Sequence, residues 1–386
     1  MGYQRGPYLY FENRSLISRK DKRYSTIIIY SLNPGNTIGG VQTFQNALPC
    51  ILKNAGAKEI RLQYFLTTIK KHFISRIINK ITNFYIFSKA VKITKPDIVI
   101  SVEWDPCGYI AEFFKSIFGF KTAIIVHGQE IYRIGSRFKR YPKRFIRDWS
   151  FRKADLLIAV SSYTAGRLKE EGIKRPVDII WNSYDDNRFA GIKRKRKFFE
   201  NNLIKLVTLS IIVVRKGHLY GLKALQILIQ SGYDVSYDII GSGDYKRNLE
   251  LYVKENNLEP HVKFYGERSD GEIRDIFAQS DIFLHPNYAA NSGKDFEGFG
   301  IVLLEAMSAG LPIVAGRDGG PADIIKDGHN GILVDGQNPV QIADAVLKLK
   351  NDSILLGSII SEEKKTLSNL SPIVMAKRYK EILSCE

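Results

Sequence analysis

Short apolar runs alternate with stretches of helical periodicity along most of the chain. Most of these runs are solid rather than alternating, which is typical of parallel strands covered on both faces. The first series comprises TIIIY (26–30), IRLQYFL (60–66), DIVISV (97–102), TAIIV (122–126), DLLIAV (155–160) and VDII (177–180). The second comprises KLVTLSI (205–211), SYDII (236–240), VKFYG (262–266), DIFLH (281–285), PIVA (312–315) and GILV (331–334). Two such series predict an α/β protein with two doubly wound, Rossmann-like domains.

A polar stretch, YDDNRFAGIKRKRK (184–197), separates the two series and is interpreted as a linker. We therefore place one domain at 25–190 and another at 191–371, followed by a segment of helical pattern at 372–386. Residues 1–24 are polar and basic without clear periodicity and are assigned to an N-terminal extension. In doubly wound sheets, ligands bind beyond the carboxyl ends of the strands, so two facing sheets predict a cleft between the domains.

Two local signals agree with this division. Ser269 and Glu272 have the spacing of a capping box and predict a helix N-terminus. Residues 301–309 contain strong helix formers, and Gly310 is placed to end that helix before the next strand.

Length and composition set outer limits. The 386 residues are 44% hydrophobic and 25% charged, as expected of a globular protein with two cores. Cys50, Cys107 and Cys385 are far apart and match no metal-binding spacing, which favours a reducing compartment. We identify no signal-peptide core and no membrane-spanning helix.

The formal net charge of +17 is unevenly distributed. Residues 1–190 contain 32 Lys and Arg against 15 Asp and Glu, whereas residues 191–386 contain 25 of each. The whole excess therefore lies in the first half. This asymmetry predicts that the first half faces something anionic: nucleic acid, a membrane surface or a phosphorylated substrate.

The stretch FEGFGIVLLEA (296–306) combines carboxylates and glycines at the start of the helix predicted at 301–309. Gly298 and Gly300 precede that helix, where free N–H groups and the helix dipole favour a phosphate. Glu305 lies on an apolar helix face.

A buried carboxylate needs hydrogen-bond donors, and a ribose diol would supply two to Glu305. Glu297 precedes the helix and would meet sugar hydroxyls in the cleft. Taken singly, Glu297 could be a solvated loop residue, and Glu305 could pair with a buried Arg or Lys. Their combination with two glycines in a strand–loop–helix context favours the ligand site.

Here a family resemblance becomes evident. EGFGIVLLE (297–305) resembles the E-x7-E motif of family 4 retaining glycosyltransferases, which have the GT-B fold. Further motifs follow in the order of that family over about residues 25–380: GGVQTF (39–44), VHGQE (126–130), VSSYT (160–164), RKG (215–217), IIGSGD (239–244) and FYGERSDGEI (264–273). The combination carries the resemblance, rather than any single motif.

The resemblance implies a role for each matched residue. The implied catalytic residues are His127, Lys216 and Glu297, of which His127 would hydrogen-bond the donor sugar and Lys216 would neutralise the leaving diphosphate. The implied donor-binding residues are Gly39, Gly40, Arg215, Gly241, Gly243, Arg268, Gly298, Phe299, Gly300, Ile301 and Glu305. Gly39 and Gly40 would allow close backbone approach, although an ordinary strand–helix turn explains them equally well. The resemblance also implies that the helix at 372–383 returns to the first domain.

Several of these positions have plainer interpretations. A histidine at a strand end is often structural, and a lysine in a loop is often solvated. Gly241 and Gly243 form G-x-G, but Lys246 stands where a third glycine would complete a dinucleotide fingerprint. One position departs from the family pattern: Ser210 stands six residues before Lys216, where an arginine is usual. Transition-state charge would then rest on Lys216, the helix N-terminus and Arg215.

The resemblance implies a reaction in which a sugar moves from a nucleotide sugar (UDP- or GDP-linked) to an acceptor with retention of anomeric configuration. The chain contains no D-x-D motif, so we expect neither a metal nor another cofactor. The leaving phosphate would assist deprotonation of the acceptor, and no side-chain nucleophile is required.

The acceptor is expected to be a lipid-linked oligosaccharide or a polysaccharide. KKHFISRIINKITNFYIF (70–87) has apolar residues at helical spacing flanked by lysines and arginines, and RFKRYPKRFIR (137–147) is also cationic. Such a helix can lie on an anionic membrane or pack on its own sheet. We expect a cytoplasmic protein, peripheral at the inner face of the plasma membrane.

Two other classes remain open. A sugar-nucleotide epimerase of similar two-domain fold would act without an acceptor and would need an acid–base pair, which the sequence does not reveal. A basic, non-catalytic binding protein would associate with nucleic acid in a strongly salt-dependent way. A transferase that binds the donor but does not turn it over is a further alternative, given Ser210. We favour the glycosyltransferase and expect no nucleic-acid partner.

Overall fold

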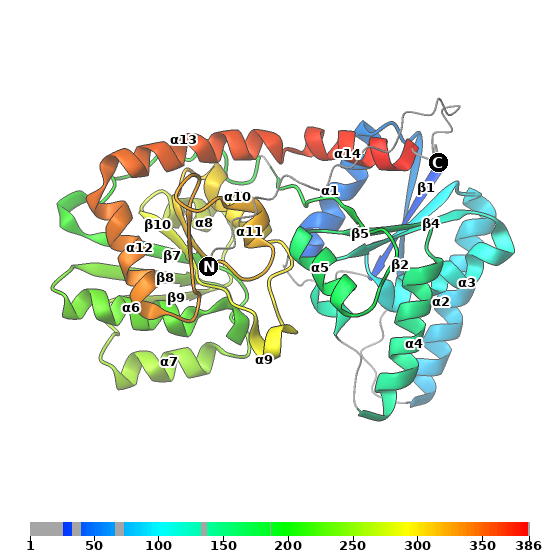
Figure 1. Cartoon of the computed structure of the whole chain (residues 1–386), viewed down its shortest axis with the longest axis horizontal. Helices are drawn as coiled ribbons and strands as arrows, with labels where there is room; N and C mark the ends of the chain where they lie inside the picture. The colour runs from blue at the N-terminus through cyan, green and yellow to red at the C-terminus, as the bar shows by residue number, and fades with distance from the viewer. Residues whose placement is uncertain (1–25, 33–39, 66–72, 133–136, 186, 385–386) are drawn as a thin grey trace.

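A computed structural model describes residues 26–32, 40–65, 73–132, 137–185 and 187–384 of the protein. The predicted extension 1–24, Gly39 and Cys385 lie outside the described residues. Two α/β halves lie side by side, and the final two helices run along the top of both (Figure 1).

Each half is built on a six-stranded parallel sheet. The first sheet has the order β2-β1-β3-β4-β5-β6. Its strands are β1 (Thr26–Leu32), β2 (Glu59–Phe65), β3 (Ile98–Ser101), β4 (Lys121–Val126), β5 (Leu156–Ala159) and β6 (Asp178–Ile179). The second sheet has the order β12-β11-β10-β7-β8-β9. Its strands are β7 (Ile204–Leu209), β8 (Val235–Ile240), β9 (Val262–Gly266), β10 (Ile282–His285), β11 (Ile313–Gly316) and β12 (Ile332–Val334). The predicted fold class is confirmed, and a strand forms at every predicted apolar run.

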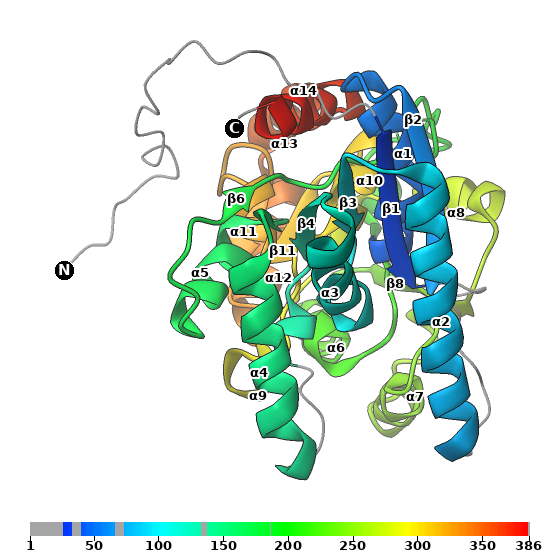
Figure 2. The ribbon, with the colours of Figure 1, turned by 90° about the vertical axis from the view of Figure 1, so that its right-hand side faces the viewer.

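Helices cover both faces of each sheet, as a parallel sheet requires (Figures 1 and 2). In the first half they are α1 (Gly40–Asn54), α2 (Phe73–Thr94), α3 (Tyr109–Phe118), α4 (Arg137–Lys153) and α5 (Ser162–Glu170), with short turns η1 (Trp104–Gly108) and η2 (Gln129–Ile131). In the second half they are η3 (Glu200–Asn202), η4 (Val214–Lys216), α6 (His218–Gln230), α7 (Lys246–Glu255), α8 (Asp270–Phe277), α9 (Ala290–Gly293), α10 (Ile301–Ser308), α11 (Pro321–Ile324), α12 (Pro339–Asn351), α13 (Ser353–Asn369) and α14 (Pro372–Ser384).

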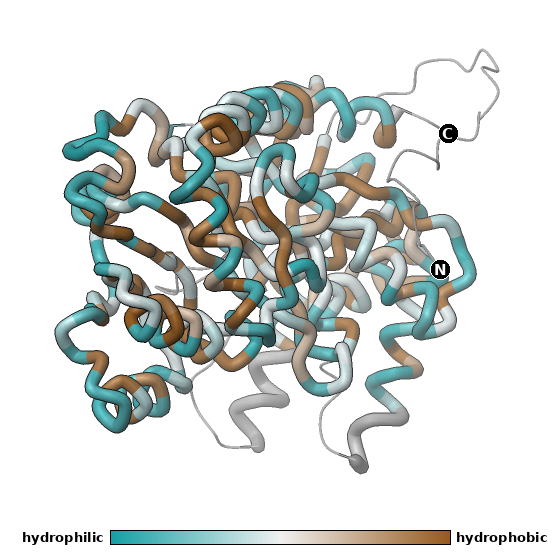
Figure 3. Tube along the Cα trace, turned by 60° about the vertical axis from the view of Figure 1, so that its left-hand side comes forward, coloured by the Kyte–Doolittle hydropathy of each residue, from teal (hydrophilic) through white to brown (hydrophobic). Residues whose placement is uncertain are grey.

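The hydrophobic interior follows from the strand pattern. Successive strand residues point to opposite faces, so Ile27 and Ile29 enter one core cluster whereas Ile28 and Tyr30 enter another. The first of these clusters is shared by both halves, since it also contains Phe299 and Leu304. Figure 3 shows hydrophobic stretches concentrated inside and hydrophilic ones toward the outside.

The local signals predicted at helix ends are present. Ser269 and Glu272 form the reciprocal bonds of a capping box at α8. Gly310 follows the end of α10 with a left-handed φ of +73°. The C-terminal helix α14 packs against α1 of the first half.

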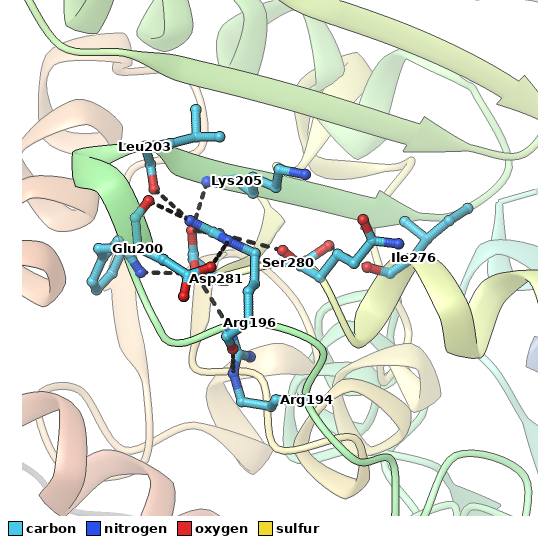
Figure 4. Close-up of polar contacts among 10 residues, drawn as sticks. Arg194, Arg196, Glu200, Leu203, Lys205, Ile276, Ser280 and Asp281 are labelled. Carbon is cyan, nitrogen blue, oxygen red and sulfur yellow. Dashed lines mark hydrogen bonds and ion pairs between the residues drawn. The ribbon is translucent and has the colours of Figure 1, made fainter.

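The basic part of the predicted linker is not simply solvated. The carboxylate of Asp281, at the start of β10, is completely buried and accepts from Arg196 Nη1 (2.7 Å) and Arg194 Nη2 (3.3 Å). It also accepts from the backbone N–H groups of Phe199 (3.0 Å) and Lys205 (2.8 Å). This cluster, drawn in Figure 4, fixes the linker to the amino end of the second sheet, at the end opposite to the loops considered below.

Candidate active site

The order of the second sheet defines where a ligand belongs. β7 and β10 lie side by side, and the chain continues from β7 to β8 and β9 on one side but from β10 to β11 and β12 on the other. Doubly wound sheets bind ligands beyond the carboxyl ends of the strands at such a switch point. Lys216 follows β7 and Glu297 follows β10, so the topology brings both residues to this point.

Lys216 and Glu297 form a buried ion pair between Nζ and Oε2. Nε2 of His285, the last residue of β10, lies 3.7 Å from the same carboxylate oxygen. Burial opposes ionisation of Glu297, but the charge of Lys216, the nearby imidazole of His285 and the charge of Arg215 outweigh it. The pKa of Glu297 therefore lies well below its usual range, and the carboxylate is ionised at neutral pH.

Close backbone packing fixes the turn that carries Lys216. Gly217 has a φ of +72°, and a Cβ there would lie 1.7 Å from the carbonyl oxygen of Pro286. The N–H of Tyr288 donates to the carbonyl of Arg215 (3.0 Å), which joins the same two loops. Burial lowers the pKa of Lys216, and Glu297 opposes that shift.

Arg215, the neighbouring cation, pairs with Asp295 at 3.0 Å between Nε and Oδ1. Ser210, where the family usually has an arginine, places its hydroxyl 3.1 Å from Nε2 of His218. Burial lowers the pKa of His218 to about 3 and that of His285 to about 4, so both imidazoles are neutral at neutral pH. Neither histidine therefore replaces the missing cation.

The segment from Gly298 to Ile301 lies where the two halves meet. A Cβ on Gly298 would lie 1.8 Å from the carbonyl oxygen of His127, in the first half. Gly300 precedes α10 with a φ of +97°. Phe299, Gly300 and Ile301 are buried. Among the described residues, no hydrogen bond links the N–H of Phe299 or Gly300 to an acceptor, so these donors are left for another group.

Glu305, on α10, is 4% exposed and accepts a hydrogen bond from Nη1 of Arg188 at 2.5 Å. Arg188 belongs to the linker and also pairs with Asp270 at 2.8 Å. Burial raises the pKa of Glu305, and Arg188 opposes the shift without cancelling it. The structure thus shows the arginine pairing that the sequence left open for Glu305, while the ribose contact stays a prediction.

His127 follows β4 and faces the Gly298 backbone, as the preceding contact shows. Its main-chain N–H donates to Oε1 of Glu130 (2.5 Å), and its ring meets that of Phe44 edge-on at 5.1 Å between centroids. Burial lowers the pKa of His127 to about 4, so the ring is neutral at neutral pH. Nε2 is buried without a hydrogen-bond partner among the described residues. This nitrogen therefore has no partner within the described protein, and its contact with a donor hydroxyl stays a prediction.

The remaining predicted residues are less central. A Cβ on Gly241 would lie 2.0 Å from the carbonyl oxygen of Ser210, and one on Gly243 would lie 2.2 Å from that of Ile212. Close packing of strand-end loops thus explains both glycines. Arg268 lies beyond the edge strand β9 and contacts Glu272 at 3.4 Å. Gly40 begins α1.

Sequence reasoning missed the aromatic contact that joins the halves. Phe296, immediately before Glu297, is completely buried. Its ring lies 4.9 Å from that of Tyr163 and 6.5 Å from that of Tyr132, and a Cβ on Gly128 would lie 2.7 Å from a ring atom of Phe296. Asp323 adds a polar link, since it accepts from the N–H of Ser162 (2.6 Å) and from Nε1 of Trp181 (2.9 Å). Phe296 stands between Asp295 and Glu297, outside any apolar run, so neither Phe296 nor Asp323 carried a sequence signal.

Metal and membrane predictions can be compared with the described part of the chain. Within it, no group of three or more His, Cys, Asp or Glu is arranged to hold a metal ion. None of its helices combines the length and apolar character that crossing a membrane requires. Metal independence and the cellular location stay predictions.

Comparisons with known proteins agree with this fold. The model for glycosyl transferases group 1 matches residues 191–366, and the model for glycosyltransferase family 4 matches residues 57–188. Anabaena HepE, crystallised with UDP, is 18% identical with a TM-score of 0.72, covering 93% of this chain and 99% of that one. Sucrose-phosphate synthase from Thermosynechococcus elongatus is 16% identical with a TM-score of 0.73, covering 92% and 97%.

Curated relatives point the same way. A GDP-mannose-dependent alpha-(1-6)-phosphatidylinositol monomannoside mannosyltransferase of Mycobacterium tuberculosis (strain CDC 1551 / Oshkosh) is 30% identical over 204 residues, 51% of this chain and 53% of that protein. The amylovoran biosynthesis glycosyltransferase AmsK of Erwinia amylovora is 25% identical over 268 residues, 68% and 63% of the two chains. The chain spans about half the length of the mycobacterial relatives that it matches.

Fold and comparisons agree on the type of protein that the chain resembles. The two parallel sheets and the solved relatives show the GT-B fold. The two family models match different halves of the chain, so each half is similar to glycosyltransferases of these types.

Proposed function

We propose that this protein transfers a sugar from a nucleotide-sugar donor to a lipid-linked or saccharide acceptor, with retention of configuration and without a metal. The observation that carries the proposal is the buried Lys216–Glu297 pair at the switch point of the second sheet. Beside it are the backbone donors of Phe299 and Gly300, which face no acceptor among the described residues.

Glu297 and Lys216 exchange partners when the donor binds. Without donor, the ionised carboxylate neutralises a buried ammonium group. Sugar hydroxyls donate to Glu297 in the complex, and Lys216 is then free to face the diphosphate. Charge that develops on the leaving group is stabilised by Lys216, by Arg215 and by the peptide N–H groups before α10.

Two further groups complete the donor site. Glu305 accepts from the ribose hydroxyls, and neutral His127 exchanges a hydrogen bond with a sugar hydroxyl near the anomeric carbon. The C–O bond to the diphosphate breaks as the acceptor hydroxyl oxygen bonds to the anomeric carbon, and the departing phosphate oxygen takes the acceptor proton on the same face of the sugar. No protein side chain acts as nucleophile in this sequence.

The acceptor side is proposed to be a membrane surface, on the cytoplasmic face of the plasma membrane. α2 and α3 are adjacent, with the rings of Phe84 and Phe113 5.8 Å apart. Their outer faces expose Ile81 (64%), Tyr85 (65%) and Ile117 (60%). In an otherwise basic half, this apolar patch suits an interfacial contact with anionic lipid.

Liposome flotation tests this membrane contact. We expect recovery of the protein with anionic vesicles to exceed that with neutral vesicles, and equal recovery contradicts the proposal.

The function is tested with a panel of UDP- and GDP-sugars, scored by thermal shift and by slow donor hydrolysis. One donor should stabilise the protein and release nucleoside diphosphate, faster once an acceptor is added. Turnover to an isomeric nucleotide sugar without acceptor would favour the epimerase. Salt-sensitive nucleic-acid binding with no donor binding would favour the basic binding protein.

A further inference from the structure

The carboxylate of Glu305 has two oxygens in different situations. Oε1 accepts from Nη1 of Arg188, whereas no hydrogen bond joins Oε2 to another described residue. The side chains of Glu305 and Arg188 are 5% and 16% exposed. The carboxylate is largely buried, so a donor on its second oxygen would offset the remaining cost of its desolvation. The arginine satisfies one oxygen and leaves the other for a ligand.

Arg188 itself is held from three directions. Its Nε and Nη2 both donate to Oδ1 of Asp270, at 3.0 Å and 2.8 Å. Its guanidinium lies over the ring of Phe189, 4.6 Å from the centroid, and Phe189 is completely buried with its ring 5.3 Å from that of Phe277. The planar guanidinium thus reaches Glu305 with a fixed direction.

The main chain around Arg188 is fixed independently. Arg274, on α8, donates from Nη1 to the carbonyl of Arg188 (2.7 Å) and from Nη2 to the carbonyl of Ala190 (3.1 Å). This second arginine secures the same linker segment, and among the described residues no hydrogen bond or ion pair joins it to α10. It therefore provides a natural control for the effect of linker anchoring alone.

We propose that Arg188 is a positioning residue for donor binding: it occupies Oε1 of Glu305 and so turns Oε2 toward the ribose hydroxyls of the nucleotide. The proposal rests on the proposed function, because it assigns Glu305 to the ribose. It adds that the segment connecting the two halves takes part in reading the ribose. A merely structural arginine would neutralise Glu305 for folding without favouring ligands that carry ribose hydroxyls.

The test compares the binding of UDP and GDP with that of their 2′,3′-dideoxy analogues by calorimetry. Wild-type protein should prefer the ribose form of whichever diphosphate it binds by about tenfold or more, since a site built for hydroxyls rejects ligands that lack them. Arg188→Met should weaken binding of the ribose form by about tenfold and that of the dideoxy form by less than about twofold. Arg188→Lys should restore part of the preference, because lysine retains the positive charge but lacks the planar guanidinium with its several N–H donors.

Two further variants separate positioning from folding. Arg274→Met should lower the unfolding temperature but keep the wild-type ribose preference. In a Glu305→Gln background, Arg188→Met should change the ribose preference by less than about twofold, because the carboxylate through which Arg188 acts has been replaced by an amide. If Arg188→Met does not fold, Arg188→Lys and the Glu305→Gln pair provide the same comparison.

The outcomes are distinguishable. Unchanged ribose preference in folded Arg188 variants overturns this inference and leaves the proposed function standing. Equal weakening of ribose and dideoxy forms also overturns it, since that is the result of general destabilisation. A wild-type protein that binds neither UDP nor GDP nor any of their sugars overturns both.

Discussion

The two buried glutamates, Glu297 before α10 and Glu305 within it, each meet a basic side chain, yet their pKa values move in opposite directions. Around Glu297 the charged neighbours are cationic, Lys216 and Arg215, and its pKa falls well below the usual range. Burial raises the pKa of Glu305, and Arg188 does not cancel the shift, because this cation is shared with Asp270 and Asp185 adds further negative charge.

This difference separates two tasks along one short segment. The surroundings of Glu297 have a surplus of positive charge, which suits the place where a diphosphate leaves. The surroundings of Glu305 have a deficit, which suits recognition of neutral hydroxyls and disfavours another anion. Neither glutamate therefore forms a simple one-to-one pair with a basic residue.

The largest expected effect is at Glu297. Glu297→Gln should lower donor turnover by about a thousandfold, because a neutral amide replaces the charged acceptor for sugar hydroxyls and leaves Lys216 without its counter-charge. Turnover is measured as release of nucleoside diphosphate, and far-UV circular dichroism checks the fold. Glu259→Gln, at an exposed glutamate of the same half, is the control. Turnover within threefold of wild type would remove Glu297 from the site.

Replacement of Lys216, the partner of Glu297, should reduce turnover somewhat less. Lys216→Met should lower turnover by about a hundredfold, and Lys216→Arg should restore part of the loss, since the backbone donors and Arg215 remain. Burial lowers the pKa of Lys216, so wild-type turnover should fall with rising pH before the ordinary lysine value of 10.5 is reached. In Lys216→Arg this alkaline fall should disappear up to pH 10.5. An unchanged alkaline limb would show that another group titrates there.

Replacement of Glu305 should mainly change the affinity for the nucleoside diphosphate rather than the turnover. Glu305→Gln should weaken binding of the ribose diphosphate by about tenfold and change turnover at saturating donor by less than about threefold. Calorimetry and steady-state kinetics give the two values. A larger loss in kcat than in affinity would mean that the two glutamates share one task.

The pH dependence of stability sharpens the contrast. The folded pKa of Glu297 lies below the ordinary value of 4.5, so its stabilising contribution is present above pH 4.5 and is lost as the pH falls through the folded pKa. The folded pKa of Glu305 lies above 4.5, so the wild type loses stability relative to Glu305→Gln as the pH rises above 4.5. Urea unfolding from pH 3 to 7 should therefore give opposite trends for the two variants. Parallel trends would show that the two environments are alike.

The smallest effect is expected where the halves touch. Asp323→Asn keeps one oxygen for Ser162 or Trp181 and loses the charge, so the unfolding temperature should fall by about 2 to 4 °C. Turnover should change by less than about fivefold. A change as large as that of Glu297→Gln would move the central site toward this contact.

Much of the fold could be predicted because local sequence patterns determine where the strands and helix ends form. All twelve apolar runs became strands within one or two residues of the expected ends, and Ser269 and Glu272 capped α8 as their spacing indicates. The position of Glu297 beyond β10 follows from the same rules, since a strand, a loop and a helix are each local.

The partners of the site residues could not be predicted in this way. Glu305 and Arg188 are separated by 117 positions, and Glu297 and Lys216 by 81, so no periodicity connects them. Arg188 stood in a polar stretch whose other arginines, Arg194 and Arg196, serve Asp281 instead. Which arginine becomes buried depends on how the linker packs against the second half. The sequence pattern does not indicate this packing.

The central claim is that a leaving diphosphate is received beside Lys216 by the backbone donors that precede α10. A crystal structure of the protein with the nucleoside diphosphate that it binds tests this most directly. We predict phosphate oxygens within hydrogen-bonding distance of the N–H groups of Phe299 and Gly300 and of Nζ of Lys216. A diphosphate bound elsewhere, with the Lys216–Glu297 pair intact and residues 298–301 untouched, would contradict the account.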